Sequence, residues 1–426
     1  MKNFILSGVV LLLAGQLAWA VEESAAFDWQ RARALYQRQQ QGEQLTPAEQ
    51  DIVAQAKRLH AQQQQPQPSG ADAAQMDWPR ATQLFQCSQR GEKLSPEDQA
   101  YLDKAKALRQ QRQNGGGGAS EATGPATGGK DSVGLIPLCD LGTNKYKGEE
   151  GGLYGGGKNE PSPELAAAAK KELANIRPLD AAGKPSADGK VGLLSVGMSN
   201  TTMEYARFKQ LADADPEKSP RLVIVDGAQG GQAATQWLTG PESRVWQTVD
   251  ERLKAAGLTA QQVQVVWLKQ ANMRPTEAFP EHAKKLQADV AAGLRLLKAK
   301  FPNLRIAYLS SRIYAGYATT ALNPEPFAYE GAFAMRTLIL AQSKGAADLN
   351  WDAARGAVQT PLLLWGPYLW ADGTKARSDG LMWTRNDLTP RDGTHPSPAG
   401  RQKVAEQLLT FCKTNPFARG WFLAKP

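Results

Sequence analysis

The sequence predicts an α/β fold: a three-layer α/β/α, flavodoxin-like parallel sheet over 131–426, preceded by an all-α region of helical hairpins. From Asp131 onward, short apolar runs alternate with helical patterns, and the runs are apolar almost throughout. Strands of that kind are typical of a parallel sheet covered by helices on both faces. Nearer the N-terminus, Asp28-Trp29 recurs as Asp77-Trp78 and begins a repeat of helical character.

The composition limits the class of protein. The chain has 426 residues, of which 42% are hydrophobic and 22% charged, so we expect two or three domains and exclude a fibrous protein. The 50 basic and 42 acidic residues include no dense basic run, and no nucleic-acid partner is expected. With only three histidines and three cysteines, a zinc site rich in these ligands is nearly excluded, and we expect no metal and no cofactor.

Residues 1–20 have the pattern of a secretory signal peptide. Lys2 supplies the positive start, Phe4 to Leu13 form the apolar segment, and Ala18-Trp19-Ala20 is a small-x-small cleavage site. The apolar segment is too short to anchor the chain across a bilayer. We therefore expect cleavage after Ala20, a secreted or periplasmic protein, and no stable membrane insertion afterwards.

The repeat predicts two helical hairpins, over 21–60 and 76–109. In each copy a hydroxyl residue is followed by proline and, three positions after the hydroxyl, by an acidic residue: Thr46 and Glu49, then Ser95 and Asp98. This spacing is typical of a capping box at the start of a helix. Hairpins this short must pack on each other, on the main domain or on a partner, for which an envelope component is one candidate. A Gln-rich linker over 61–75 and a Gly-rich linker over 110–130 flank the second hairpin.

The main domain alternates strands and helices. The predicted strands are Val191–Val196, Leu222–Val225, Val263–Leu268, Leu304–Leu309 and Pro361–Trp365. The predicted helices are Thr202–Ala212, Ser243–Ala256, Glu281–Lys300, Pro326–Lys344 and a last one from Ser397-Pro398 to about Thr414. Ligands of such sheets bind at the carboxyl ends of the strands, so the polar residues after each apolar run are the candidates for a site.

Cysteine use fits an oxidising compartment. Cys139 opens the main domain and Cys412 lies in its predicted last helix, so a disulfide between them would tie the two ends of the domain together. The sequence leaves open whether this bond forms. If it does, Cys87 is free.

Polar residues that suit nucleophilic catalysis follow several strands. Ser199 lies in a turn between a strand and a helix, where a serine is either a nucleophile or a simple N-cap. Gln229-Gly230-Gly231 and Asn272 follow the next two strands and suit either oxyanion donors or ordinary loop contacts. Asp392 and His395 are three residues apart just before the last helix, close enough for the carboxylate to orient the ring. His60 and His282 have no nearby nucleophile, and His282 is expected on an exposed helix.

Together these residues resemble the four sequence blocks of the SGNH (GDSL-like) hydrolase superfamily, over about 190 to 415. The resemblance implies a Ser-His-Asp triad of Ser199, His395 and Asp392. It also implies an oxyanion hole formed by the N–H of Ser199, by Gly231 or its neighbour Gly230, and by Asn272. Met198 stands where the first block usually has Asp, and Met273 where the third usually has Asp. The chain therefore resembles a divergent branch, whose substrate is open.

The resemblance implies ester hydrolysis through an acyl-serine. Aromatic, Arg and Gln residues near the strand ends would suit an acylated sugar, and the candidates for substrate binding are Gln229, Gly230, Arg312 and Trp370. Most of the aromatics are as well explained by core packing. We expect a carbohydrate esterase that removes an O-acetyl or short acyl group from a carbohydrate or cell-wall polymer. The alternative is a non-catalytic envelope or polysaccharide-binding protein with a degenerate SGNH domain.

Overall fold

The computed structural model describes residues 129–240 and 242–424, together with 35, 38–39, 46, 48–53, 95, 97–99 and 101. The chain divides into two compact units, Met1–Gly117 and Gly118–Pro426. The predicted signal peptide, the Gln-rich linker, the Gly-rich linker up to residue 128, His60 and Cys87 lie outside the described residues. The boundaries of the N-terminal segments therefore stay predictions.

The few described residues of the first unit include the two predicted helix starts. The Thr46 N–H donates to a Glu49 carboxylate oxygen at 2.9 Å, and the Glu49 N–H donates to the Thr46 hydroxyl at 3.4 Å. In the second copy, the Asp98 N–H donates to the Ser95 hydroxyl at 3.1 Å. Helical residues follow each of these caps.

A five-stranded parallel sheet forms the centre of the second unit, in the order β4-β3-β5-β6-β7. The strands are β3 (Val191–Gly197), β4 (Leu222–Val225), β5 (Val263–Lys269), β6 (Ile306–Ser310) and β7 (Leu362–Trp365). All five were predicted within one or two residues, and the parallel α/β fold class is confirmed. The sheet is flanked by helices, and its strand order is that of a flavodoxin-like fold.

The helices are α6 (Pro163–Asn175), α7 (Ser199–Asp213), α8 (Arg244–Ala255), α9 (Glu281–Lys300), α10 (Phe327–Ser343), α11 (Pro398–Thr414) and the short α12 (Arg419–Phe422). Single 3₁₀ turns are η1 (Ala234–Leu238), η2 (Ala260–Gln262), η3 (Ala347–Leu349), η4 (Ala353–Arg355) and η5 (Arg385–Asp387). A two-residue ladder pairs β1 (Lys145–Tyr146) with β2 (Glu149–Glu150). Neither this ladder nor α6 was predicted.

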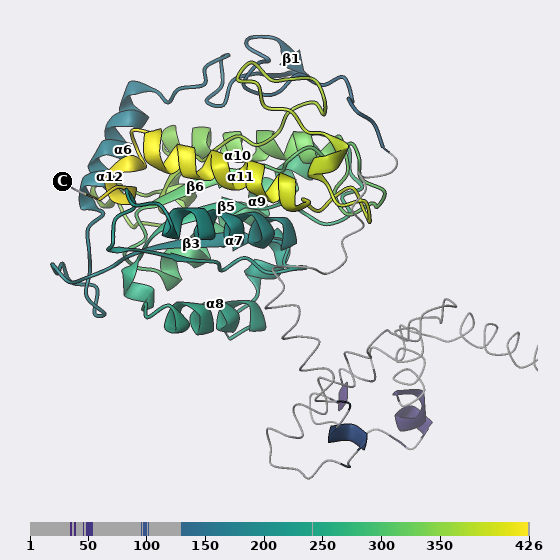
Figure 1. The fold of residues 1–426 in the computed structure, drawn as a ribbon, viewed down its shortest axis with the longest axis horizontal. Helices are drawn as coiled ribbons and strands as arrows, with labels where there is room; N and C mark the ends of the chain where they lie inside the picture. Colours follow the sequence, from purple (N-terminus) through teal and green to yellow (C-terminus); the bar gives the residue numbers. More distant parts are fainter. Residues whose placement is uncertain are drawn as a thin grey trace, which may run out of the picture. The chain divides into compact units, whose positions relative to one another are not determined.

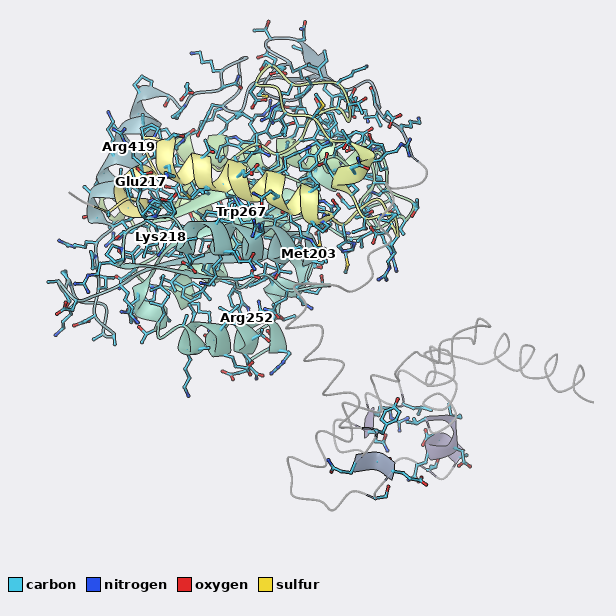
Figure 2. All side chains as sticks on the ribbon, in the orientation of Figure 1. Met203, Glu217, Lys218, Arg252, Trp267 and Arg419 are labelled. Carbon is cyan, nitrogen blue, oxygen red and sulfur yellow. The ribbon has the colours of Figure 1, made fainter. Side chains whose placement is uncertain are left out.

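The layers follow from which way the strand residues point. Trp267 of β5 stacks on Tyr205 of α7, with ring centroids 5.6 Å apart, while its neighbour Leu268 faces α8 and α9. Figure 1 shows α7 and α11 side by side in front of the strands, with α10 behind them. Figure 2 labels Trp267 under the front helices. Because helices cover both faces of the sheet, the residues of the central strands are apolar on both faces. This explains the unbroken apolar runs in the sequence.

The structure answers the question about the cysteines. Cys139 and Cys412 are both free thiols, and Cys412 is buried in α11. The disulfide between them does not form in this structure. In the part of the chain that the structure describes, no helix has both the length and the hydropathy needed to cross a bilayer.

Candidate active site

Ser199 is the first residue of α7, at the carboxyl end of β3. The chain leaves β3 at Gly197, passes through Met198 in an extended conformation, and enters the helix at Ser199. No side chain caps this helix, so the serine hydroxyl is not used on the backbone. In Figure 2, Met203 marks this end of α7, and Glu217 and Lys218 lie beyond its other end. A helix N-terminus also favours negative charge that develops beside it.

Ser199, His395 and Asp392 form a continuous line of contacts. The Ser199 Oγ lies 2.8 Å from the His395 Nε2, and the His395 Nδ1 lies 2.7 Å from an Asp392 carboxylate oxygen. The side chains of His395 and Asp392 are 22% and 15% exposed, so the group is reachable from solvent. These distances lie within the range expected between a nucleophile, its base and the group that orients the base.

The Asp392 carboxylate is held in its ionised form. Its second oxygen accepts hydrogen bonds of 2.9 Å from the Thr389 hydroxyl and from the N–H groups of Thr394 and His395. Burial acts to raise the pKa of Asp392, but the hydrogen bonds, led by that of the His395 side chain, lower this pKa far more, to well below its usual range. An ionised Asp392 accepts the Nδ1 proton of His395, and in this neutral tautomer the Nε2 that faces Ser199 carries no proton and can accept one.

The turn between Asp392 and His395 depends on Gly393. Gly393 has φ +57, and a Cβ added there would lie 1.9 Å from the Tyr317 carbonyl oxygen. Any larger side chain would push this turn away from the loop after β6.

The glycine loop after β4 lies next to Ser199. A Cβ on Gly230 would lie 4.0 Å from the Ser199 Cβ, whereas Gly231 has φ +75 and faces open space. The Gln229 N–H donates to the Gly197 carbonyl at 3.1 Å and ties this loop to the serine turn. The Gln229 side chain points away from the serine and donates to the Val245 carbonyl at 2.8 Å. This contact holds the loop, and the predicted contact of Gln229 with substrate stays a prediction.

Asn272 follows β5 and is fixed from two directions. Its Nδ2 donates to a carboxylate oxygen of Asp289 at 2.9 Å, and its carbonyl accepts from the Asn323 side chain at 3.1 Å. The Asn272 amide has two N–H groups, so Asp289 orients it with one and leaves the other available. Asp289 lies on α9, 17 residues further along the chain, and nothing in the sequence pattern indicated it.

Arg312 and Trp370, which were predicted to bind substrate, are buried. Trp370 is 0% exposed, and its indole N–H donates to Glu325 at 2.8 Å. Arg312 is 2% exposed, and its guanidinium has no hydrogen-bond partner among the described residues. Burial raises the pKa of Glu325 to about 7, although Trp370 and two backbone N–H groups donate to it. Both side chains are buried in this structure, so neither offers an exposed surface to a polymer.

A buried ion pair joins α7 to β5. Lys269 donates to Glu204, and their side chains are 1% and 0% exposed. Burial lowers the pKa of Lys269 to about 8 and raises that of Glu204. Lys269, the last residue of β5, therefore holds α7, the helix that carries Ser199, through an ion pair that is buried from solvent.

His282 corrects a second expectation. It was expected on an exposed helix, but it is 5% exposed, and its Nε2 lies 2.5 Å from Glu330 of α10. His282 lies in the first turn of α9, and its ring packs against Phe279 and Phe327.

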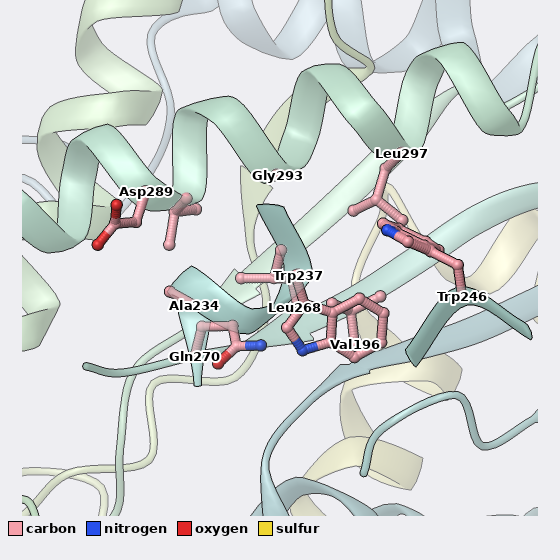
Figure 3. A pocket seen from close by; sticks show the side chains of 10 residues that line it. Val196, Ala234, Trp237, Trp246, Leu268, Gln270, Asp289, Gly293 and Leu297 are labelled. Atoms are coloured by element: carbon pink, nitrogen blue, oxygen red, sulfur yellow. The ribbon is translucent and has the colours of Figure 1, made fainter. Parts of the chain in front are cut away.

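Two hollows among the described residues do not include Ser199, His395 or Asp392 in their lining. Figure 3 shows a cavity of about 10 Å³ between η1, α8, α9 and the sheet, lined by Trp237, Trp246 and Leu297, with Asp289 at one end. It has room for about one water molecule and none for an acyl chain. A hollow of about 690 Å³ lies along the C-terminal half of α9, away from Ser199. Among the residues with described positions, no cluster of His, Cys, Asp and Glu could hold a metal ion.

The fold and this arrangement define a three-layer α/β protein with a serine, a histidine and an aspartate in contact at the carboxyl edge of its sheet. Protein YxiM from Bacillus subtilis is similar to the chain, with 14% identity, a TM-score of 0.31, and 54% of this chain and 57% of that chain covered. The periplasmic domain of a lipopolysaccharide acetyltransferase from Salmonella ser. Paratyphi A is similar at 12% identity and a TM-score of 0.29, with 58% of this chain and 96% of that chain covered. The chain thus spans a little over half the length of YxiM. The sequence matches no family model and no curated protein.

Proposed function

We propose that the protein is a secreted or periplasmic serine esterase that removes an O-acetyl or other short acyl group from a carbohydrate or cell-wall polymer. The observation that carries this proposal is the contact line from Ser199 through His395 to Asp392. A histidine held by an ionised carboxylate and facing an uncapped serine is the arrangement that activates a serine for attack.

In the proposed reaction, His395 takes the proton of Ser199 as Oγ attacks the ester carbonyl. The N–H of Ser199, the N–H groups of the Gly230-Gly231 loop and the free N–H of Asn272 then stabilise the oxyanion. His395 returns the proton to the leaving alcohol. It then takes a proton from a water molecule whose oxygen attacks the acyl-serine carbonyl, and it gives that proton to the Ser199 Oγ as the bond between Oγ and the acyl group breaks and the free acid leaves. Each of these groups belongs to the chain itself, and the proposal needs no metal or cofactor.

The test uses the chain from residue 21 onward with p-nitrophenyl acetate, butyrate and octanoate. We expect the highest kcat/KM on acetate or butyrate and a loss of at least about 10⁴-fold in Ser199→Ala. Ser343→Ala, an exposed serine of α10, is the matched control and keeps full activity. Equal rates in wild type and Ser199→Ala on every ester, including acetylated glycans, would leave the non-catalytic binding protein as the better interpretation.

A further inference from the structure

Three segments form the rim around Ser199 and are joined by backbone and side-chain hydrogen bonds. The Arg274 N–H donates to the Leu322 carbonyl at 2.7 Å, beside the contact between Asn323 and the Asn272 carbonyl. The Thr319 N–H donates to the Asp392 carbonyl at 2.9 Å. The loop over 318–323 therefore brings the segment after Asn272 close to the segment that carries His395.

Two exposed arginines lie on this rim, Arg274 two residues after Asn272 and Arg391 directly before Asp392. Neither guanidinium makes a hydrogen bond or an ion pair with any residue that the structure describes. Arg274 also has a backbone φ of +51, in the left-handed region that residues other than glycine rarely adopt. Its backbone is tied by the N–H bond to Leu322, and no hydrogen bond of its side chain to a described residue contributes.

Apart from the buried Arg312, the arginines of neighbouring segments are already engaged. Arg377 pairs with Asp379, and Arg385 pairs with Asp131. Acidic groups of the neighbouring segments are bound within the protein: Asp392 holds His395, Asp289 holds Asn272, Glu325 is buried, and Glu277 lies 3.9 Å from Lys285. Among the described residues of these segments, the rim therefore presents two arginines without an ionic partner, and the acidic side chains named here are already engaged.

The whole domain shares this bias. Residues 131–426 contain 36 Lys and Arg against 29 Asp and Glu, a surplus of seven positive charges. Such a surplus attracts an anionic polymer before it docks.

We propose that Arg274 and Arg391 bind negative charge on the polymer, so that the enzyme acts on an acylated glycan whose sugars carry carboxylate or phosphate groups. This inference rests on the proposed esterase function and names the substrate class of the same site. The guanidinium group presents a planar fork of N–H donors that matches both anions. A neutral glycan would leave both arginines without a partner.

The experiment compares wild type with Arg274→Gln, Arg391→Gln and the double variant. The substrates are p-nitrophenyl acetate, acetylated glucomannan as the neutral polymer, acetylated polygalacturonate as the carboxylate polymer, and an acetylated teichoic acid as the phosphate polymer. At low salt, we expect the double variant to raise KM for one or both acidic polymers by about 10- to 100-fold, with kcat nearly unchanged. Arg274→Lys and Arg391→Lys should restore part of this affinity, and 0.5 M salt should remove most of the difference.

The controls separate this inference from the proposed function. Arg295→Gln, on α9 far from the rim, should change none of the rates, and no arginine variant should change turnover of p-nitrophenyl acetate. Ser199-dependent turnover with no preference for an acidic polymer over glucomannan would overturn the inference alone. Equal losses on charged and neutral substrates would also overturn it. If Ser199→Ala matches wild type on every ester, the proposed function itself fails.

Discussion

Two histidine–carboxylate pairs among the described residues have nearly the same local contact. In the surface pair, His395 and Asp392 are joined at 2.7 Å, and in the buried pair His282 and Glu330 are joined at 2.5 Å. In both pairs the hydrogen bonds to the carboxylate outweigh its burial and lower its pKa. The two pairs differ in what surrounds them.

The surface pair faces a hydroxyl, and the buried pair faces aromatic rings. The second ring nitrogen of His395 lies 2.8 Å from Ser199, whereas the ring of His282 packs edge-on against Phe279 and Phe327. Glu330 also accepts bonds from Tyr146 at 2.5 Å and Lys147 at 2.9 Å. The same pair of residue types can thus serve as a candidate base at an open strand end and as a structural tie between α9, α10 and the β1–β2 ladder.

The largest expected effect tests this division directly. His395→Ala should lower kcat/KM on p-nitrophenyl acetate by roughly 10⁴- to 10⁶-fold, because it removes the proposed base. His282→Ala should stay within about threefold of wild type when both are assayed well below their unfolding temperatures. Comparable losses in the two variants would break the distinction between the pairs.

The next effect concerns stability, and here the buried pair should matter more than the surface pair. Glu330→Ala should lower the free energy of unfolding by about 3–5 kcal/mol, because it leaves the buried His282 without its partner. Asp392→Ala should cost less, since the surface pair is partly exposed and water can replace part of the contact. Urea denaturation followed by tryptophan fluorescence measures both. A larger loss for Asp392→Ala would contradict the structural role of the buried pair.

The proposed oxyanion donors sharpen the comparison, because the proposed reaction assigns them to the surface pair and not to the buried one. Asn272→Ala should reduce kcat by about 10²- to 10³-fold with little change in KM, as one preorganised donor is lost. Asn303→Ala is the matched control, because Asn303 donates to the Gln261 carbonyl near the amino end of the sheet and should leave kcat unchanged. A similar kcat for Asn272→Ala and wild type would remove Asn272 from the proposed oxyanion hole.

Acid should weaken the surface pair through Asp392. Because the folded-state pKa of Asp392 lies below its unfolded value of about 3.9, Asp392 contributes stability above about pH 4. That contribution is lost as the pH falls through the folded-state pKa. Because a hydrogen bond to a charged group is worth about 2 kcal/mol, we expect the lost stability to be of that size. Wild type and Asp392→Asn should therefore differ in unfolding free energy at pH 7 and approach each other near pH 2. A constant difference between pH 7 and pH 2 would show that Asp392 titrates normally.

Most of the sheet could be predicted, because burial on both faces leaves a direct mark on the sequence. The unbroken apolar runs of β3, β5 and β6 record their central position. The β1–β2 ladder has only two residues in each strand, too few to produce a pattern. The predicted helix after β3 began at Thr202, while α7 begins at Ser199, because a helix without a side-chain cap has no start signal.

The candidate site was predictable where its residues follow strands and not where they lie on helices. Ser199, Asn272, Asp392 and His395 all stand just after a strand or before a helix, where position in the chain implies position in space. The burial of His282, Arg312 and Trp370 depends on tertiary packing, which spacing along the chain does not encode. Asp289 is one of many polar residues of α9, and only the fold places it against Asn272.

Asp289 offers the smallest and most specific of these tests. It touches no proposed reacting atom and acts only by orienting the Asn272 amide, so it is a positioning residue. Asp289→Ala should lower kcat by roughly tenfold, the equivalent of one lost hydrogen bond of about 1.4 kcal/mol, with KM unchanged. Asp289→Asn, which keeps an acceptor for the same N–H, should recover most of the activity. In the Asn272→Ala background, Asp289→Ala should have no further effect on kcat, because its partner is gone. An additive loss in the double variant would mean that Asp289 acts on the reaction by another route, such as its negative charge beside the oxyanion.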